Sequence, residues 1–300
     1  MLMSAPSGLT VCAVVITHDR RALLRECLQA IEAQTRQADA LLVVDNASSD
    51  GSVDLVREEF PQAELMALQR NEGSAGGFHE GLKWGLERGY DWVWVMDGDC
   101  IPTPTALERL LDALDQLDDL PTAVMLASKV LWTDGTTVNG MHPQNIPAFK
   151  IGGEMDLFTA GMERGLPPLR VATFASVLFK REVIAKHGLP LKHYFMWSDD
   201  TEYTARLMRD NHGYFVPSSV AYHKSPTAHA PWDCGDRFYY AVRNGLFFLR
   251  TDSYRPKERV SHGLIVAEQT RRYLLTERFS PHSLRIVARG LKDGLLRKAA

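Results

Sequence analysis

Short apolar runs alternate with segments of helical period along most of the chain. Residues 11–16, 41–44 and 92–96 are nearly continuous apolar runs, the pattern of strands that are buried on both faces of a sheet. Between the first two runs, apolar residues from Leu23 to Ile31 recur every three to four positions, which is the period of an amphipathic helix. This alternation with short links predicts an α/β fold, with a Rossmann-like, mostly parallel central sheet flanked by helices.

Polar residues follow each of these predicted strands directly. In doubly wound sheets, ligands bind beyond the carboxyl ends of the strands. The polar residues at those ends are Thr17, His18, Asp45, Asn46, Asp97 and Asp99. We therefore expect these residues to converge on one edge of the sheet.

Asp97 and Asp99 are separated by a single glycine and follow a buried apolar run. Burying a carboxylate is unfavourable unless it is paired or neutralised. A divalent cation that itself holds a phosphorylated ligand would neutralise both groups. A strand-end turn in which the aspartates cap backbone amides explains the same tripeptide, so the pair alone does not decide between the two.

A glycine-rich stretch, residues 71–77, follows a weaker predicted strand and opens the next helix. Amides at a helix start can bind phosphate, which makes Asn71, Gly76 and Gly77 candidates for donor binding. A tight turn with close packing of helix on sheet is the alternative. The chain contains neither G-x-G-x-x-G nor G-x-x-x-x-G-K-[ST], which argues against a Rossmann dinucleotide site and a P-loop.

A second acidic group, residues 199–202, opens a predicted helix directly after the aromatic segment 194–197. An Asp at the N-cap with a Glu three residues later is a capping box, and acidic residues in a first turn suit the helix dipole. A capping box accounts for Asp199 and Glu202. It leaves Asp200 free, and we identify Asp200 as the candidate general base.

His223 ends another short predicted strand. A lone histidine is most often a structural residue. An imidazole nevertheless suits a cation that Asp97 and Asp99 already hold, provided that the chain returns it to the same edge. The strand pattern allows this return, so His223 is the candidate third metal ligand.

Composition narrows the classes of function. The chain has 300 residues, 45% of them hydrophobic and 24% charged, as in an ordinary soluble globular protein. A formal net charge of -3 carries no overall signature of nucleic-acid binding. The four cysteines form no C-x-x-C pair, which argues against a zinc site or a disulfide framework. We see no basic leader followed by an apolar segment and no apolar run of bilayer length, so we expect a cytoplasmic protein.

The pattern is helical from residue 236 onward, which predicts a catalytic domain at 1–235 and a helical C-terminal region at 236–300. Residues 132–168 show no clear period and predict a long loop or lid. Residues 271–300 carry eight Lys or Arg interleaved with leucines. Basic amphipathic helices lie on anionic membrane surfaces, but a solvated helix packed on the catalytic domain would have the same pattern. Both alternatives remain open at this point.

Taken in order, these motifs resemble a family 2 glycosyltransferase of the GT-A fold. The segments that carry the resemblance are residues 14–18, 43–51, 71–77, 96–99, 197–202 and 222–223. Within that family, residues 76–78 and 238–244 are most similar to bacterial galactofuranosyltransferases that initiate galactan chains and to related rhamnosyltransferases. The resemblance covers roughly residues 11–224.

The resemblance implies a role for each matching residue. Asp200 would be the catalytic base. The donor-binding residues would be Thr17, His18, Asp45, Asn46, Asn71, Gly76, Gly77, Asp97 and Asp99. The ligands of a Mn2+ or Mg2+ ion would be Asp97, Asp99 and His223, and the acceptor would lie against Trp197, Asp199 and Glu202.

The implied reaction is an inverting, metal-dependent transfer of a sugar from a nucleotide-diphosphate donor to a hydroxyl of a glycan acceptor in bacterial cell-surface polysaccharide synthesis. UDP-galactofuranose is the first expected donor and dTDP-rhamnose the second. The acceptor is expected to be polyprenyl-diphosphate-linked and reached from the inner face of the membrane, with no nucleic-acid partner and an open oligomeric state. A nucleotidyltransferase would need a basic glycine-rich loop after the first strand, which residues 17–20 lack, and a non-catalytic sugar-nucleotide-binding protein would not need Asp200.

Overall fold

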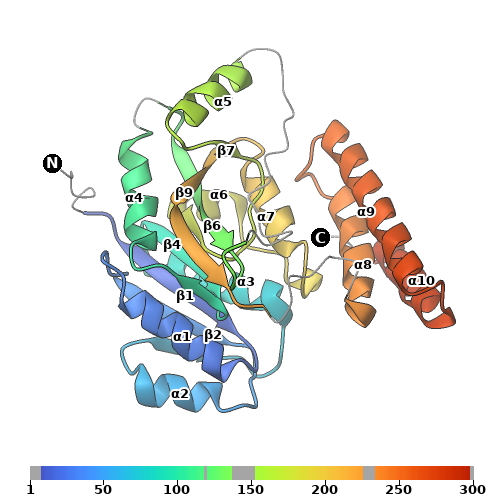
Figure 1. Ribbon diagram of the computed structural model, residues 1–300, viewed down its shortest axis with the longest axis horizontal. Helices are drawn as coiled ribbons and strands as arrows, with labels where there is room; N and C mark the ends of the chain where they lie inside the picture. Colours follow the sequence, from blue (N-terminus) through green and yellow to red (C-terminus); the bar gives the residue numbers. More distant parts are fainter. Residues whose placement is uncertain (1–7, 118–119, 137–152, 226–233, 298–300) are drawn as a thin grey trace.

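The structure is a computed structural model that describes residues 8–117, 120–136, 153–225 and 234–297. Over these ranges, helices cover both faces of one central sheet (Figure 1). The strands are β1 Val11–Thr17, β2 Ala40–Asp45, β3 Glu64–Ala67, β4 Trp92–Asp97, β5 Cys100–Pro102, β6 Ala123–Leu131, β7 Pro168–Leu169, β8 Val177–Lys180 and β9 His212–His223. The helices are α1 Arg21–Glu32, α2 Ser52–Glu59, α3 Gly73–Arg88, α4 Ala106–Asp115, α5 Gly153–Glu163, α6 Arg181–His187, α7 Asp199–Leu207, α8 Phe238–Leu249, α9 Pro256–Thr276 and α10 Pro281–Leu296, with short 3-10 turns at Lys192–Tyr194 and Gly235–Arg237.

The sheet has the order β3-β2-β1-β4-β8-β6-β9-β5, and β7 pairs with β9. Strands β1 to β4 run parallel to their neighbours in the N-terminal half, as the alternation of strands and helices predicts. Strand β8 then pairs antiparallel with both β4 and β6. The α/β fold with helices on both sides of a central sheet is therefore confirmed, and the antiparallel pairs among the described residues are β4–β8, β6–β8, β5–β9 and β7–β9.

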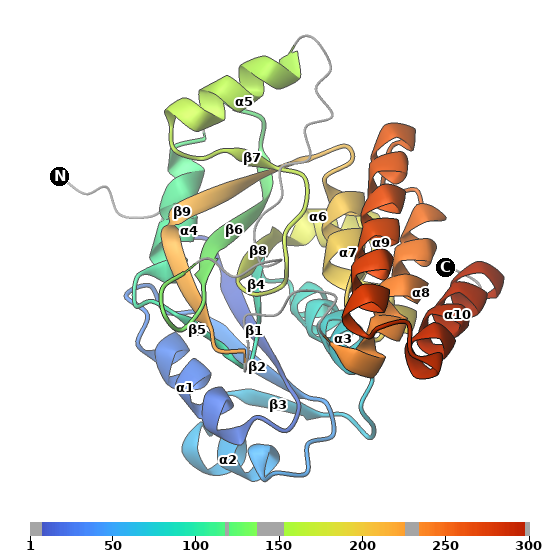
Figure 2. The same ribbon diagram turned by 45° about the vertical axis from the view of Figure 1, so that its right-hand side comes forward.

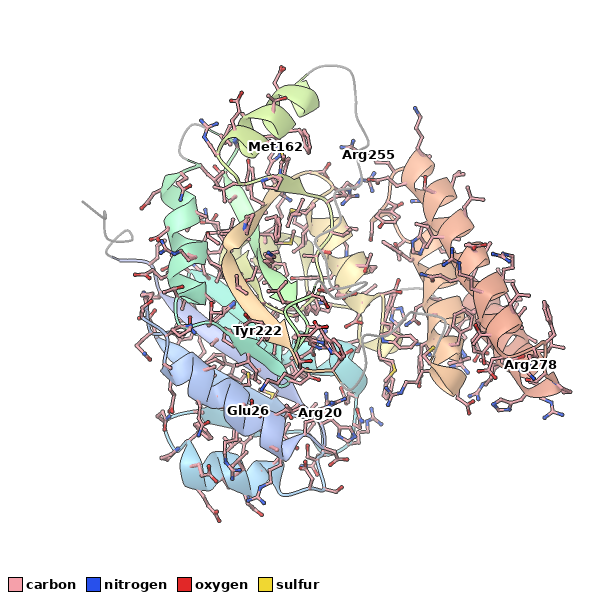
Figure 3. The ribbon with its side chains drawn as sticks, viewed as in Figure 1. Arg20, Glu26, Met162, Tyr222, Arg255 and Arg278 are labelled. Carbon is pink, nitrogen blue, oxygen red and sulfur yellow. The ribbon has the colours of Figure 1, made fainter. Side chains whose placement is uncertain are left out.

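Helices α8, α9 and α10 lie together beside α7, on one side of the sheet (Figure 2). Arg278, in the turn between α9 and α10, lies at the outer end of this group (Figure 3). Buried side chains of α8 join the cores of the preceding part: Phe247 packs with Ala75 and Tyr194, and Phe248 packs with Ala205. No helix among the described residues is long and apolar enough to cross a bilayer.

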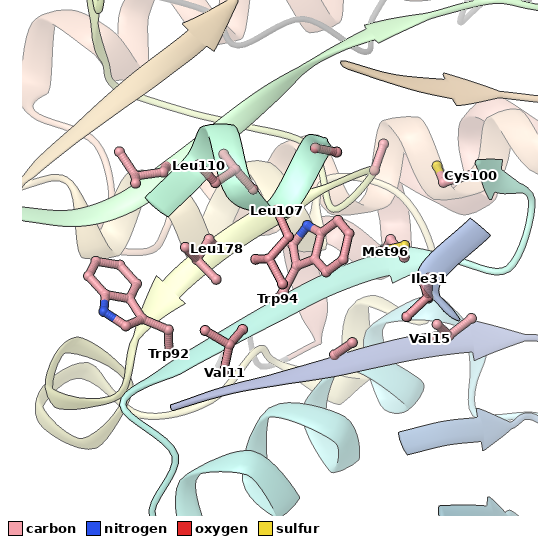
Figure 4. Close-up of a cluster of buried hydrophobic side chains, with 14 of the residues drawn as sticks. Val11, Val15, Ile31, Trp92, Trp94, Met96, Cys100, Leu107, Leu110 and Leu178 are labelled. Carbon is pink, nitrogen blue, oxygen red and sulfur yellow. The ribbon is translucent and has the colours of Figure 1, made fainter. Parts of the chain in front are cut away.

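Alternate residues of β1 face opposite sides of the sheet, because successive side chains of a strand point to opposite faces. Val11 and Val15 join Trp94 and Leu107 in the core under α1 and α4 (Figure 4). Their neighbours on β1 pack against α3 on the other side, where the apolar cluster includes Phe78. Both faces of β1 are thus covered, which explains its continuous apolar run.

Two segments differ from the prediction. The expected loop at 132–168 contains helix α5, and positions 137–152 of that segment lie outside the described residues. The two short strands expected near 214–222 are one strand, β9, which pairs with β6 along its length. The register shifts where Ser128 pairs with Val216 and Lys129 with Val220, so the polar residues that suggested a break form a bulge.

Glycines of α3 allow the helix to approach β1 closely, which makes a matched test of packing possible. A Cβ at Gly81 would lie 2.3 Å from Cγ1 of the buried Val14, a side chain that cannot move aside easily. We expect Gly81→Ala to lower the free energy of unfolding by about 1–3 kcal/mol. Gly263→Ala on α9 should instead stabilise by up to about 1 kcal/mol, because its nearest neighbour would be Leu249 Cδ1 at 3.8 Å. Urea unfolding of both variants measures the difference, and equal effects would contradict the packing argument.

Candidate functional site

The register of the parallel strands brings the predicted strand-end residues together. Thr17 pairs with Asp45 across β1 and β2, and Ile16 pairs with Asp97 across β1 and β4. Thr17, Asp45 and Asp97 therefore lie at the same end of three neighbouring strands. The convergence expected from the sequence is present for these residues.

Strand β9 returns His223 to this edge. Cys100 pairs with His223 across the antiparallel strands β5 and β9, and His223 Nε2 lies 3.2 Å from Asp99 Oδ1. Arg20 and Tyr222 mark this region in Figure 3. One possible ligand atom from each of Asp97, Asp99, Cys100 and His223 lies within 4.8 Å of the others.

The charged groups at this edge shift one another's pKa values. Burial, followed by the charge of Asp99, raises the pKa of Asp97 to about 7. Burial acts on Asp99 in the same sense, but the hydrogen bond and charge of His223, with Arg20, outweigh it and lower the Asp99 pKa. Burial disfavours the His223 cation, but the hydrogen bond to Asp99 and the charges of Asp99 and Asp97 together outweigh burial and raise the pKa of His223. The protein thus holds carboxylates close together with too little positive charge beside them. A bound divalent cation would reduce the repulsion between these carboxylates.

Three buried polar atoms at this edge have no hydrogen-bond partner among the described residues. They are Thr17 Oγ1, Asp45 Oδ2 and His223 Nδ1. The other oxygen of Asp45, Oδ1, accepts from the Ser48 amide at 2.9 Å, which fixes the carboxylate. Unpaired buried polar atoms are costly, so Thr17 and Asp45 are suited to a polar ligand.

Asp200 lies in the first turn of α7, where its Oδ1 accepts from the Thr201 amide at 2.6 Å and the Thr201 hydroxyl at 3.2 Å. Burial raises its pKa, and the two Thr201 bonds oppose that shift. The charge of Asp200 also contributes to the raised pKa of Asp97. The start of α7 therefore lies within electrostatic reach of the strand-end cluster, by which we mean Asp97, Asp99, Cys100 and His223.

The expected capping box at the start of α7 is wrong. Ser198 is the N-cap, in a left-handed conformation, and its side chain makes no capping hydrogen bond with the described residues. The Glu202 carboxylate instead accepts from Arg206 Nε at 3.0 Å and from Ser253 Oγ at 2.6 Å. These two tertiary partners take the carboxylate away from the helix start.

The predicted acceptor residues differ in their surroundings. Trp197 is half-buried, whereas Asp199 and Glu202 are only 3% and 1% exposed. Burial, followed by the charge of Asp200, raises the pKa of Asp199 well above its usual value. Of the three residues, Trp197 offers the most surface to a ligand.

Several other predicted donor residues are engaged within the protein. Asn46 donates to the Gly73 carbonyl at 2.9 Å, and Asn71 accepts from the Gly73 amide at 2.7 Å. A Cβ at Gly76 would lie 2.4 Å from Glu72 Cβ, and one at Gly77 would lie 2.4 Å from Ile16 Cγ2. These glycines therefore serve close packing.

His18 is exposed and lies 3.6 Å from Asp19. It follows Thr17 directly but is not among the residues of the strand-end cluster. The rule that ligands bind beyond the ends of the strands therefore fits the buried Thr17 better than the exposed His18.

Sequence reasoning missed Arg20 and Cys100. Arg20 Nη1 lies 3.5 Å from Asp99 Oδ2, which places a cation beside the carboxylates. Its position shortly after the end of β1 could have indicated it. Cys100 follows Asp99 directly, but its burial in the apolar core gives no signal of ligand chemistry.

A family model described as glycosyl transferase family 2 matches residues 12–188, more than half of the chain. The chain belongs to glycosyl transferase family 2. The match includes the family 2 segments at Thr17, Asp45, Asp97 and Asp99. It ends before Asp200 and His223, so the placement of these two residues beside the site comes from the structure.

Curated relatives and a solved structure agree with this family 2 assignment. The chain is 29% identical over 199 residues to the galactofuranosyltransferase GlfT1 of Mycolicibacterium smegmatis, covering 66% of this chain and 65% of the relative. It is 31% identical over 202 residues to GlfT1 of Mycobacterium tuberculosis, covering 67% and 65%. The alignments thus span slightly less than two thirds of the relatives' length. The crystal structure of an S. aureus TarS fragment in complex with UDP has a TM-score of 0.57 at 15% identity, covering 92% of this chain and 75% of that one, which supports the fold.

Proposed function

We propose that this family 2 protein transfers a sugar, with inversion, from a nucleotide-diphosphate donor to a hydroxyl group of a glycan acceptor. The observation that carries the proposal is the strand-end edge itself. There, Thr17 Oγ1 and Asp45 Oδ2, which have no partner in the described part of the chain, lie at the ends of adjacent strands, next to Asp97, Asp99 and His223. This arrangement has a polar part for a nucleoside and an acidic part for a cation.

Thr17 and Asp45 would hold the nucleoside. Asp45 Oδ1 is occupied by the Ser48 amide, which leaves Oδ2 to accept from an N–H donor. The imide N–H of uracil or thymine is such a donor. Thr17 Oγ1, the neighbouring unpartnered atom, would bind the ribose.

Asp97, Asp99 and His223 would hold a Mn2+ or Mg2+ ion. Two carboxylates and one imidazole with mutually close ligand atoms are a fitting donor set for these ions. When bound, the ion would offset the negative charge that builds on the departing diphosphate. Arg20, which lies 3.5 Å from Asp99, adds a second positive charge at the same place.

Asp200 would take the proton from the acceptor hydroxyl. Its raised pKa makes it a stronger base than an ordinary carboxylate, and Thr201 fixes Oδ1 while leaving Oδ2 for the acceptor. The deprotonated oxygen then attacks the anomeric carbon from the face opposite the diphosphate. One displacement of this kind inverts the anomeric centre and needs no protein nucleophile.

We propose UDP-galactofuranose as the donor, because the two curated relatives are galactofuranosyltransferases, and dTDP-rhamnose as the alternative. The acceptor would be a polyprenyl-diphosphate-linked glycan. The test is a thermal-shift screen over nucleotide sugars with Mn2+, followed by a transfer assay with the stabilising donor. Failure of every nucleotide sugar to stabilise the protein or to be consumed would overturn the proposed function.

We also propose that α10 contacts an anionic membrane surface. One face of α10 packs on α8, where Gly290 and Gly294 meet Val242 and Leu246. Packing of α10 on the rest of the protein is therefore compatible with contact to a membrane, because the other face of α10 leaves leucines exposed. That face carries Leu284, Leu291, Leu295, Arg285 and Lys292.

Replacing Leu291 and Leu295 with Ser should weaken binding to phosphatidylglycerol vesicles, by about tenfold or more per leucine if each enters the bilayer. Both side chains are exposed, at 42% and 60%, so their loss should not unfold the protein. Leu264→Ser on α9 is the matched control, with a side chain that is 68% exposed. Vesicle flotation measures the binding, and equal binding of all variants would contradict the proposal.

A further inference from the structure

The loop that enters α7 has a strained backbone. Phe195, Trp197 and Ser198 have positive φ values of 64°, 64° and 61°, which non-glycine residues rarely adopt. Phe195, with ψ of -59°, is the centre of a rare type of γ-turn in which the Met196 amide donates to the Tyr194 carbonyl at 2.8 Å. Such residues cost on the order of 1–3 kcal/mol each and persist only where the surroundings fix them.

Asn244 of α8 supplies much of this fixation. Its Nδ2 lies 3.0 Å from the carbonyl oxygen of Tyr194, 2.7 Å from that of Met196 and 2.8 Å from that of Trp197. Asn244 is fully buried, so water cannot replace these bonds. One amide group therefore holds the carbonyls on both sides of the strained turn.

Arg243 orients this amide. Its Nε donates to Asn244 Oδ1 at 2.8 Å, which directs Nδ2 toward the loop. Its Nη2 donates to the carbonyls of His193 and Tyr194 at 2.9 and 2.6 Å. The guanidinium carbon also lies 4.9 Å from the ring centroid of Tyr240. Arg243 is thus itself held on several sides.

Helix α3 holds the opposite side of the loop. The Ala75 amide donates to the Phe195 carbonyl at 3.2 Å, and Lys192 Nζ donates to Glu72 at 3.1 Å. A Cβ at Gly73 would lie 1.9 Å from the Phe195 oxygen, so only glycine fits there. The glycine-rich motif therefore receives the loop, and the amide of Ala75 is committed to it.

We propose that Asn244, oriented by Arg243, is a positioning residue that holds the 195–198 loop so that Trp197 and Asp200 face the site. The inference rests on the proposed function, because Asp200 is the group being positioned. It makes α8 a part of the catalytic apparatus, although this helix lies beyond the segment that matches the family model.

The first test is Asn244→Asp, which keeps the shape but removes the donor and places a charge against carbonyl oxygens. We expect kcat to fall by about 100-fold, the scale of a small misplacement of a reacting group, while UDP affinity with Mn2+ stays unchanged. Arg243→Lys is a milder second variant with a smaller loss of kcat. Asn211→Asp is the matched control at the other end of α7, where the amide donates to the Leu207 carbonyl and does not reach the loop.

The second test separates positioning from stability. If Asn244 acts through Asp200, adding Asn244→Asp to Asp200→Asn should cause no further loss of the residual rate, whereas independent effects would multiply. Hydrogen exchange of amides 194–199 should quicken in Asn244→Asp and not in Asn211→Asp. An unchanged kcat per folded Asn244→Asp molecule, or multiplying effects, would overturn the proposal. If the wild type transfers no sugar, the proposed function fails instead, while the exchange result still shows whether Asn244 holds the loop.

Discussion

Asp200→Asn is expected to lower kcat by about 10²- to 10⁴-fold, the range that a positioned general base contributes, and to leave UDP affinity nearly unchanged. The amide has the same shape and can still accept from the Thr201 amide, so α7 should keep its start. It cannot take a proton from the acceptor hydroxyl. The nucleoside groups, Thr17 and Asp45, lie at the ends of β1 and β2 and are untouched.

The measurements are transfer kinetics with saturating donor and calorimetry of UDP with Mn2+. Asp210→Asn is the matched control, because Asp210 is exposed just beyond the end of α7. This control should keep the wild-type kcat. An unchanged turnover number for Asp200→Asn would show that another group takes the proton.

Asp99→Asn is expected to remove most of the effect of Mn2+ on UDP binding. Losing an outer-shell partner of a metal already costs about 10- to 100-fold in metal affinity, and a direct ligand should cost at least as much. Asp99 is the carboxylate that both His223 and Arg20 contact, at 3.2 and 3.5 Å. Its pKa is lowered, so it is ionised and ready to bind at neutral pH.

Calorimetry of UDP with Mn2+ and with EDTA measures this effect directly. Wild-type protein should bind UDP more tightly with Mn2+, and Asp99→Asn should show little difference between the two conditions. Asp115→Asn, an exposed aspartate at the end of α4, is the control and should behave as wild type. Equal UDP affinity of the wild type in Mn2+ and in EDTA would count against Asp97, Asp99 and His223 as ligands.

The two predictions also separate the parts of the site. Asp200 lies on α7 and Asp99 at the start of β5, so each can be changed without altering the other's hydrogen bonds. A protein that loses turnover but keeps metal-linked UDP binding has lost the base alone. A protein that keeps its turnover at saturating donor but loses metal-linked UDP binding has lost only the contribution of the strand-end cluster to donor binding.

The pattern of apolar and polar residues was enough to predict the alternation of strands and helices and the polar residues at the strand ends. Thr17, Asp45 and Asp97 were predictable because burial of a strand on both faces leaves a continuous apolar run that stops where the ligand edge begins. The pair Asp97 and Asp99 was visible for the same reason. The spacing of apolar residues along a segment carries this information, since it indicates which residues of that segment face the core.

Contacts between distant segments could not be predicted from the sequence pattern and are seen in the folded chain. His223 reaches Asp99 because β9 pairs with β5, and Glu202 leaves the expected capping box because Arg206 and Ser253 take its carboxylate. Asn244 meets the loop at Trp197 from 47 residues away. Such hydrogen bonds depend on how helices pack on the sheet, and burial of a polar side chain leaves no periodic trace in the sequence. The local pattern therefore located the edge of the sheet, and the packing of distant segments decided which further groups lie beside it.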